Sequence, residues 1–67
     1  MKAWLVVYCT RETLPGPTRK HISQEAYSSL EQAQAYCIQR GGKEVTPCRF
    51  EVEGIFRYYE ITDITIV

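Results

Sequence analysis

"FEVEGIFRYYEIT", residues Phe50 to Thr62, contains two strand-like stretches separated by a single glycine, Gly54, and this segment decides the fold. In "CRFEVE", residues 48–53, apolar and charged side chains alternate, which is the pattern of a half-buried β-strand. A glycine at the end of that stretch permits a tight reversal of the chain. We therefore predict a β-hairpin whose second strand lies in "IFRYYEITDITIV", residues 55–67.

The register of this hairpin determines which of its faces enters the core. A three-residue loop at positions 53–55 would place Phe50 opposite Tyr58 and Glu51 opposite Arg57. A two-residue loop would instead oppose Phe50 to Arg57, which is the poorer chemical match. The sequence therefore favours the longer loop, and the even-numbered residues of the hairpin are predicted to face the core.

Two further strands are predicted before the hairpin. "AWLVVYC", residues 3–9, is apolar at both parities and is typical of a central strand. "KHISQEAYS", residues 20–28, has weaker alternation and is predicted as a second strand. Between them, the prolines and glycine of "TRETLPGPTRK", residues 10–20, predict a turn or a mobile loop, because proline cannot donate to a sheet ladder.

A single helix is predicted from about Ser29 to Arg40. Ser28 with Glu31, or Ser29 with Gln32, matches the capping box of a helix start, and "GG" at residues 41–42 supplies a left-handed stop. The apolar stripe of this helix consists of Leu30, Ala33 and Cys37, with Ala35, Tyr36 and Ile38 beside it.

These elements predict an α+β fold for one domain spanning residues 1–67. The expected architecture is a four-stranded, mostly antiparallel sheet with one helix on one face, in the order β-β-α-β-β, with "GGKEVTP", residues 41–47, as a linker. With Leu5, Val7 and Cys9 placed under the helix, the other sheet face is left open. The residues predicted to be displayed on that open face are Trp4, Val6, Tyr8, Arg49, Glu51, Arg57, Tyr59 and Ile61.

This open face is the main functional candidate, because aromatic residues and arginine are enriched at protein interfaces. Binding of a partner protein, self-association into a dimer, and coverage by the N-terminal loop are all compatible with it. Exposed aromatics with arginines could also stack RNA bases. The acidic residues of the hairpin would repel a phosphate backbone, so a sheet-based RNA-binding protein is the alternative and a protein partner is the expectation. "TRKH", residues 18–21, adds Arg19, Lys20 and His21, which are either solvated loop charges or a grip for a carboxylate or phosphate.

Composition excludes several classes of function. Eight basic and eight acidic side chains cancel, so no global field draws the chain to nucleic acid or to a membrane. The odd number of cysteines cannot form a closed disulfide set, which predicts reduced thiols in a cytoplasm. The apolar N-terminal stretch is too short for a signal peptide or a membrane span.

Catalysis and metal binding are also disfavoured by the sequence. Cys9, Cys37, Cys48 and His21 could supply four zinc ligands, but their spacings do not match a paired zinc site, and we expect buried cysteines instead. The acidic residues are scattered, there is one histidine, and no phosphate-binding loop occurs. We therefore predict a non-enzymatic binding protein without cofactor or metal.

In size and order of elements, and in the helix entry "SSLEQA", residues 28–33, the chain resembles small proteins that phages and mobile elements encode against bacterial defences, including compact anti-CRISPR proteins. This resemblance implies inhibition by steric blocking of a nuclease or of a nucleic-acid-binding surface in an effector complex. It carries over no individual residue. The lack of a strongly acidic surface argues against DNA mimicry as the means of inhibition.

Overall fold

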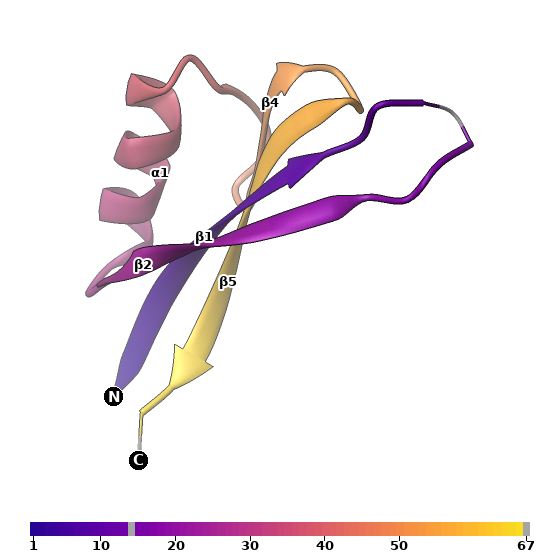
Figure 1. The fold of residues 1–67 in the computed structure, drawn as a ribbon. Helices are drawn as coiled ribbons and strands as arrows, with labels where there is room; N and C mark the ends of the chain where they lie inside the picture. The colour runs from indigo at the N-terminus through magenta and orange to yellow at the C-terminus, as the bar shows by residue number, and fades with distance from the viewer. Residues whose placement is uncertain (14, 67) are drawn as a thin grey trace.

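The computed structural model describes residues 1–13 and 15–66 (Figure 1). Leu14, in the predicted loop, and Val67, at the end of the predicted last strand, lie outside the described residues. The elements are β1 (Lys2–Thr10), β2 (Arg19–Tyr27), α1 (Leu30–Gln39), β3 (Lys43–Thr46), β4 (Arg49–Glu53) and β5 (Arg57–Thr65). The α+β class and the single helix agree with the sequence prediction. The predicted four-stranded sheet is wrong, because five strands form over the described residues.

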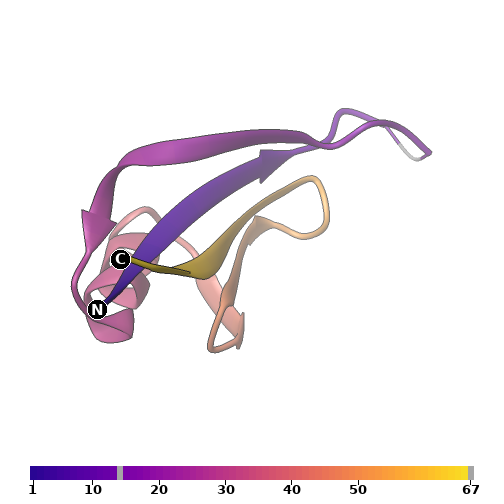
Figure 2. The same cartoon turned by 90° about the horizontal axis from the view of Figure 1, so that it is seen from below.

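The sheet is antiparallel, with the strand order β2-β1-β5-β4-β3. The first and last strands therefore pair with one another at its centre, and the N- and C-terminal ends lie side by side (Figures 1 and 2). The β1–β2 connection projects far from the helix in both views, and the molecule is elongated, at 38 × 22 × 18 Å.

Strand β3 is the element that the sequence prediction missed. Residues 41–47 were expected to form a linker, but Lys43–Thr46 pairs with β4 and forms one edge of the sheet. All four residues of β3 are exposed, so the strand has no buried face and no alternation of apolar and polar residues. Its formation depends on pairing with β4, which is a tertiary effect that local sequence does not reveal.

The ends of α1 follow the predicted capping signals. Ser29 is the N-cap, and its hydroxyl accepts a hydrogen bond from the Gln32 amide at 3.2 Å. Of the two predicted pairings, that of Ser29 with Gln32 is therefore the one that forms, and the Gln32 side chain reaches back to accept from the amide of Ser28, one residue before the cap. At the other end, the Gly41 amide donates to Ile38 and the Gly42 amide to Cys37, which is a Schellman stop with Gly41 at φ +86°.

The predicted register of the β4–β5 hairpin is wrong by one residue. Phe50 lies opposite Tyr59 instead of Tyr58, and Glu53 lies opposite Arg57. The register shifts between Glu51 and Glu53, which is the mark of a β-bulge, and Gly54 adopts φ +58° in the turn. Because side chains alternate across a strand, a slip of one residue sends every side chain of β5 to the other face.

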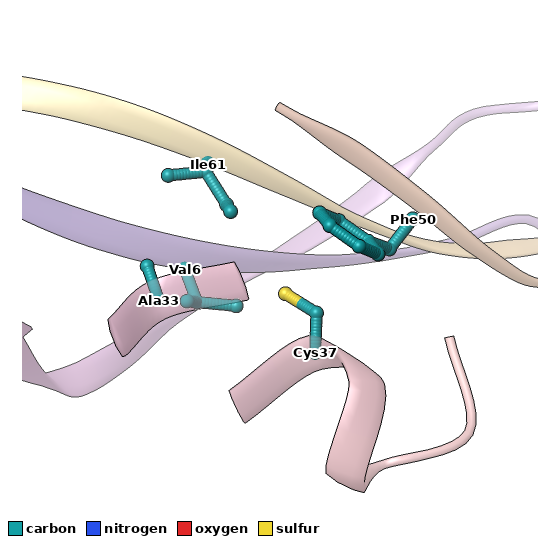
Figure 3. Packing of buried hydrophobic residues seen from close by; sticks show 5 residues of the cluster. All are labelled: Val6, Ala33, Cys37, Phe50 and Ile61. Atoms are coloured by element: carbon teal, nitrogen blue, oxygen red, sulfur yellow. The ribbon is translucent and has the colours of Figure 1, made fainter. Parts of the chain in front are cut away.

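In β1 and β5 the core consequently uses the side chains that were predicted to lie on the open face, whereas Phe50 of β4 lies in the core as predicted. The buried cluster of this core comprises Val6, Ala33, Cys37, Phe50 and Ile61 (Figure 3). The partly buried residues packed around it are Trp4, Tyr27, Leu30, Tyr36 and Tyr59. The helix therefore covers the even-numbered residues of β1 and the odd-numbered residues of β5, and the placement of Leu5, Val7 and Cys9 under the helix is wrong.

The helix-free face has a small buried cluster of its own. Val7, Cys9 and Tyr58 pack together there, and the Arg49 guanidinium lies 4.1 Å from the centre of the Tyr58 ring. A 3.4 Å ion pair between Arg49 and Glu51 extends over the same face. This face is thus closed partly by its own charged side chains, without a second helix.

Candidate partner-binding groove

Cross-strand pairing arranges the helix-bearing face in rows of side chains that run across the sheet. Partners in an antiparallel sheet point to the same face, and alternate residues of a strand share that face. Beyond the terminal Lys2–Thr65 pair, the first row holds Tyr27, Trp4 and Asp63, and the second holds Val6 and Ile61. The third row holds His21, Tyr8, Tyr59 and Phe50, and the fourth holds Arg19, Thr10, Arg57 and Glu53.

The helix is too short to cover all of these rows. Ten helical residues span about 15 Å. The nine residues of β1 span about 30 Å. The helix covers the first two rows and reaches the third through Tyr36, whose ring packs edge-on against Tyr59 at 6.2 Å. The end of the sheet that holds the fourth row is therefore left without a helix over it.

A groove of about 770 Å³ lies over this uncovered end. The backbone holds its two sides together, because the Arg11 amide donates to the Phe56 carbonyl at 2.8 Å and so joins the end of β1 to the β4–β5 turn. The residues that line the groove are Tyr8, Thr10, Arg11, Glu12, Arg19, His21, Glu53, Phe56 and Arg57.

The lining of the groove is positively charged on balance, with three arginines against two glutamates. The Arg57–Glu53 ion pair measures 3.3 Å between Nε and Oε2, but both side chains are exposed, so the pair is weak and exchangeable. The Arg11 guanidinium donates to the Thr18 hydroxyl at 2.9 Å. Arg19 makes no ion pair within the described parts of the chain, so its charge is available to a ligand.

Four tyrosines form a continuous aromatic series that leads from the helix into the groove. Tyr27 contacts Tyr36, Tyr36 contacts Tyr59 and Tyr59 contacts Tyr8, with ring centres 5.8, 6.2 and 4.9 Å apart. The pKa of Tyr59 is raised, mainly by burial and to a lesser extent by the nearby Tyr36 and Tyr8, so this phenol stays neutral at physiological pH. The series places aromatic rings at the inner end of the groove.

The structure separates the residues that were predicted to share one open face. Tyr8, Arg57 and Tyr59 do lie together, in or beside the groove, and Arg19 joins them from β2. Trp4, Val6 and Ile61 instead pack in the core, where Val6 and Ile61 are buried. The correction follows from the register slip and from the helix packing on this face. Arg49, Glu51 and Lys20 lie on the helix-free face, Lys20 as the cross-strand partner of Cys9.

Several lining residues were not among the predicted site residues. They are Thr10, Arg11, Glu12, Glu53 and Phe56. Thr10 could have been found from the sequence, because it continues the even parity of Trp4, Val6 and Tyr8 by one more step. Glu53 ends β4, and Arg11, Glu12 and Phe56 come from the two connecting segments, whose side-chain directions depend on tertiary contacts such as the Arg11–Phe56 hydrogen bond.

Metal-ligating side chains are scattered over residues 1–13 and 15–66. No group of three or more His, Cys, Asp or Glu side chains in that part of the chain could hold a metal ion. Cys9 and Cys37 are buried, and burial raises the pKa of both thiols, that of Cys37 to about 11. The expected inward orientation of Cys48 is wrong, because it lies exposed in the β3–β4 turn.

Comparison with known proteins gives no relative, since no protein-family model, curated protein or solved structure matches the chain. Within the described residues, α1 is the only helix, and it is neither long nor apolar enough to cross a membrane.

Proposed function

We propose that this protein is a small non-enzymatic protein-binding module and that the groove at the helix-free end of the sheet is its contact surface. The observation that carries this proposal is the clustering of tyrosine, phenylalanine and arginine side chains around a preformed hollow. These residue types dominate the energetics of protein interfaces, because they combine large contact area with directional hydrogen bonds. Phe56, a large apolar residue exposed to 37 %, has no core role there.

A protein partner accounts for the groove better than a nucleic acid does. Arginines beside aromatic rings are also used to bind single-stranded RNA. Glu12 and Glu53 line the same groove, however, and would repel a continuous string of phosphates. The chain as a whole has a net charge of zero, so it offers no long-range attraction for a polyanion.

Self-association is a second candidate, and it uses a different surface. The helix-free face exposes Ile22 on β2 and Ile64 on β5, which leaves apolar area uncovered. A homodimer that buried this face would serve a structural or assembly role. It would make the molecular mass measured by light scattering depend on protein concentration.

The finer proposal is that the module inhibits a bacterial defence effector, as its resemblance to small phage-encoded proteins implies. Its support is the small size and the sequence of short elements around one helix. Its location would be the cytoplasm, where the three thiols stay reduced. Blocking would be steric, through occupation of a protein surface of the effector.

Site-directed photocrosslinking in bacterial lysate tests the proposal. A photoreactive phenylalanine analogue replaces Phe56 in the groove, and in a matched variant it replaces Ile64 on the helix-free face, which is exposed to a similar extent. We expect a specific protein adduct from position 56 and none from position 64. An adduct only from position 64 would move the contact surface to the helix-free face and refute the groove. Mass spectrometry of the captured protein then tests the inhibitor idea, which requires a defence effector.

A further inference from the structure

We infer that the groove accepts an extended acidic segment of the partner protein, with its carboxylates bound between Arg19 and Arg57. This inference rests on the proposed function and specifies the chemistry of the partner. It concerns the fourth row of side chains, at the end of the sheet farthest from the helix.

The two arginines flank a single threonine on the middle strand. Thr10 pairs with Arg19 of β2 on one side and with Arg57 of β5 on the other. Since neighbouring strands lie about 5 Å apart, the two arginine Cα atoms are about 10 Å apart. The short Thr10 side chain lies between two long cationic ones, so the row forms a shallow depression with a guanidinium on each side. A carboxylate placed over Thr10 could accept from both guanidiniums and from the hydroxyl.

The next row inward fits the spacing of an extended chain. His21 and Tyr8 lie two residues along their strands from Arg19 and Thr10, which is about 7 Å. Alternate side chains of an extended peptide have the same spacing. A segment that runs along β1 can therefore place a carboxylate over Thr10 and an aromatic or aliphatic side chain against Tyr8, while Phe56 lines the groove on the other side of Thr10, next to Arg11.

The charges of the groove select a protein segment and disfavour a nucleic acid. Arg19 is without an ion pair within the described residues, and the exposed Glu53 of the Arg57 pair can be displaced by a ligand carboxylate. Glu12 and Glu53 remain at the sides, where a polymer with a charge on every unit would meet them. A peptide with carboxylates at alternate positions can leave neutral residues beside these glutamates.

The test is an NMR titration of the ¹⁵N-labelled full chain with defined probes. The first probe is an eight-residue peptide of alternating glutamate and tyrosine, the second replaces each glutamate by lysine, and the third is an eight-nucleotide oligothymidylate. We expect the acidic peptide to bind and to shift the amide signals of Thr10, His21 and Arg57. The lysine peptide and the oligonucleotide should bind at least about tenfold more weakly.

Charge reversal supplies the matched variants. Arg19→Glu with Arg57→Glu should weaken the acidic peptide by roughly tenfold or more and should create binding of the lysine peptide, which an unfolded chain could not do. Lys2→Glu with Lys43→Glu changes the net charge by the same amount on exposed residues outside the groove lining, and should leave binding unchanged. Equal effects of the two double variants would refute the inference.

The remaining outcomes separate this inference from the proposed function. Equal affinity for the acidic and lysine peptides, or no shift of the amide signals with either, would overturn the inference that the partner segment is acidic. Crosslinking from position 56 would still support the groove as a protein-binding surface. If the oligonucleotide binds more tightly than the acidic peptide and its affinity falls steeply with added salt, the groove binds nucleic acid. That result would overturn both the acidic-segment inference and the proposed protein-binding function.

Discussion

Replacing Ile61 by alanine is expected to destabilise the protein far more than replacing Ile64, which lies three residues later on the same strand. Ile61 is 6 % exposed and packs in the core cluster, whereas Ile64 is 40 % exposed on the other face. Truncation of a buried isoleucine to alanine costs about 2–5 kcal/mol. Exposed substitutions usually stay within about 0.5 kcal/mol. A chain of 67 residues has a free energy of unfolding of roughly 3–10 kcal/mol, so Ile61→Ala removes a large part of it.

Urea denaturation followed by circular dichroism and by the fluorescence of Trp4 measures this difference. Both variants should keep the denaturant dependence of the parent, so that the midpoints report stability directly. If Ile61→Ala leaves too little folded protein, Ile61→Val should still show a loss of about 0.5–1.5 kcal/mol. A greater loss for Ile64→Ala than for Ile61→Ala would mean that the helix packs on the opposite face, and the rows that form the groove would then be wrongly assigned.

Three further predictions concern the packing around the helix. Gly42→Ala should cost more stability in urea than Gly41→Ala, because a Cβ at Gly42 would lie 2.8 Å from the Cys37 carbonyl oxygen and 3.0 Å from the Phe50 Cβ. At Gly41 only the positive φ opposes an alanine, at a cost of about 1–2 kcal/mol. Equal losses of stability in the two variants would contradict the close approach of Gly42 to its neighbours. A thiol reagent should modify Cys48 quickly in the native protein and all three cysteines only in urea; a second fast native thiol would contradict the burial of Cys9 and Cys37. Burial raises the pKa of the Cys37 thiol from 9.0 to about 11, so above pH 9 the unfolded chain loses this proton before the folded protein does. Ionisation of Cys37 should therefore leave the free energy of unfolding unchanged below pH 9 and should lower it between pH 9 and about 11. Denaturation across that range should show a smaller fall for Cys37→Ala, and an unchanged fall would remove the thiol as its cause.

The parts of the fold that were predicted correctly are those encoded by local signals. The helix lies within one residue of its expected bounds at each end, because Ser29, Gln32 and the Gly41–Gly42 pair act within a few positions of one another. Strands β1 and β2 also lie within one residue of their predicted ends. For β1 the density of β-branched and aromatic residues was sufficient, since few other structures accommodate them.

The errors arose where one strand depends on another. Phe50 and Tyr58 are both buried, as predicted, but Tyr59 packs beside Phe50 under the helix and Tyr58 is buried on the helix-free face, because the bulge between Glu51 and Glu53 inserts one extra residue. Both registers oppose apolar to apolar residues over part of the hairpin, so cross-strand chemistry alone could not choose between them. The choice depends on packing against the helix, where Tyr36 meets Tyr59. Tyr8, Arg57 and Tyr59 do share one face, as predicted, but the slip moves Arg49 and Glu51 of β4 to the opposite face.

The groove also explains why so small a protein extends its strands beyond its helix. The fourth row contains Arg19, Thr10 and Arg57, none of which is buried, so this end of the sheet adds little hydrophobic stabilisation to a chain near the lower size limit for a core. It is nevertheless held in place by the Arg11–Phe56 backbone bond and by the Arg11–Thr18 side-chain bonds. A surface that is ordered before it meets its partner loses less conformational entropy on binding. Most of the conformational entropy lost on binding would then come from the extended peptide of the partner. This loss is smaller for a short partner segment than for a long flexible one.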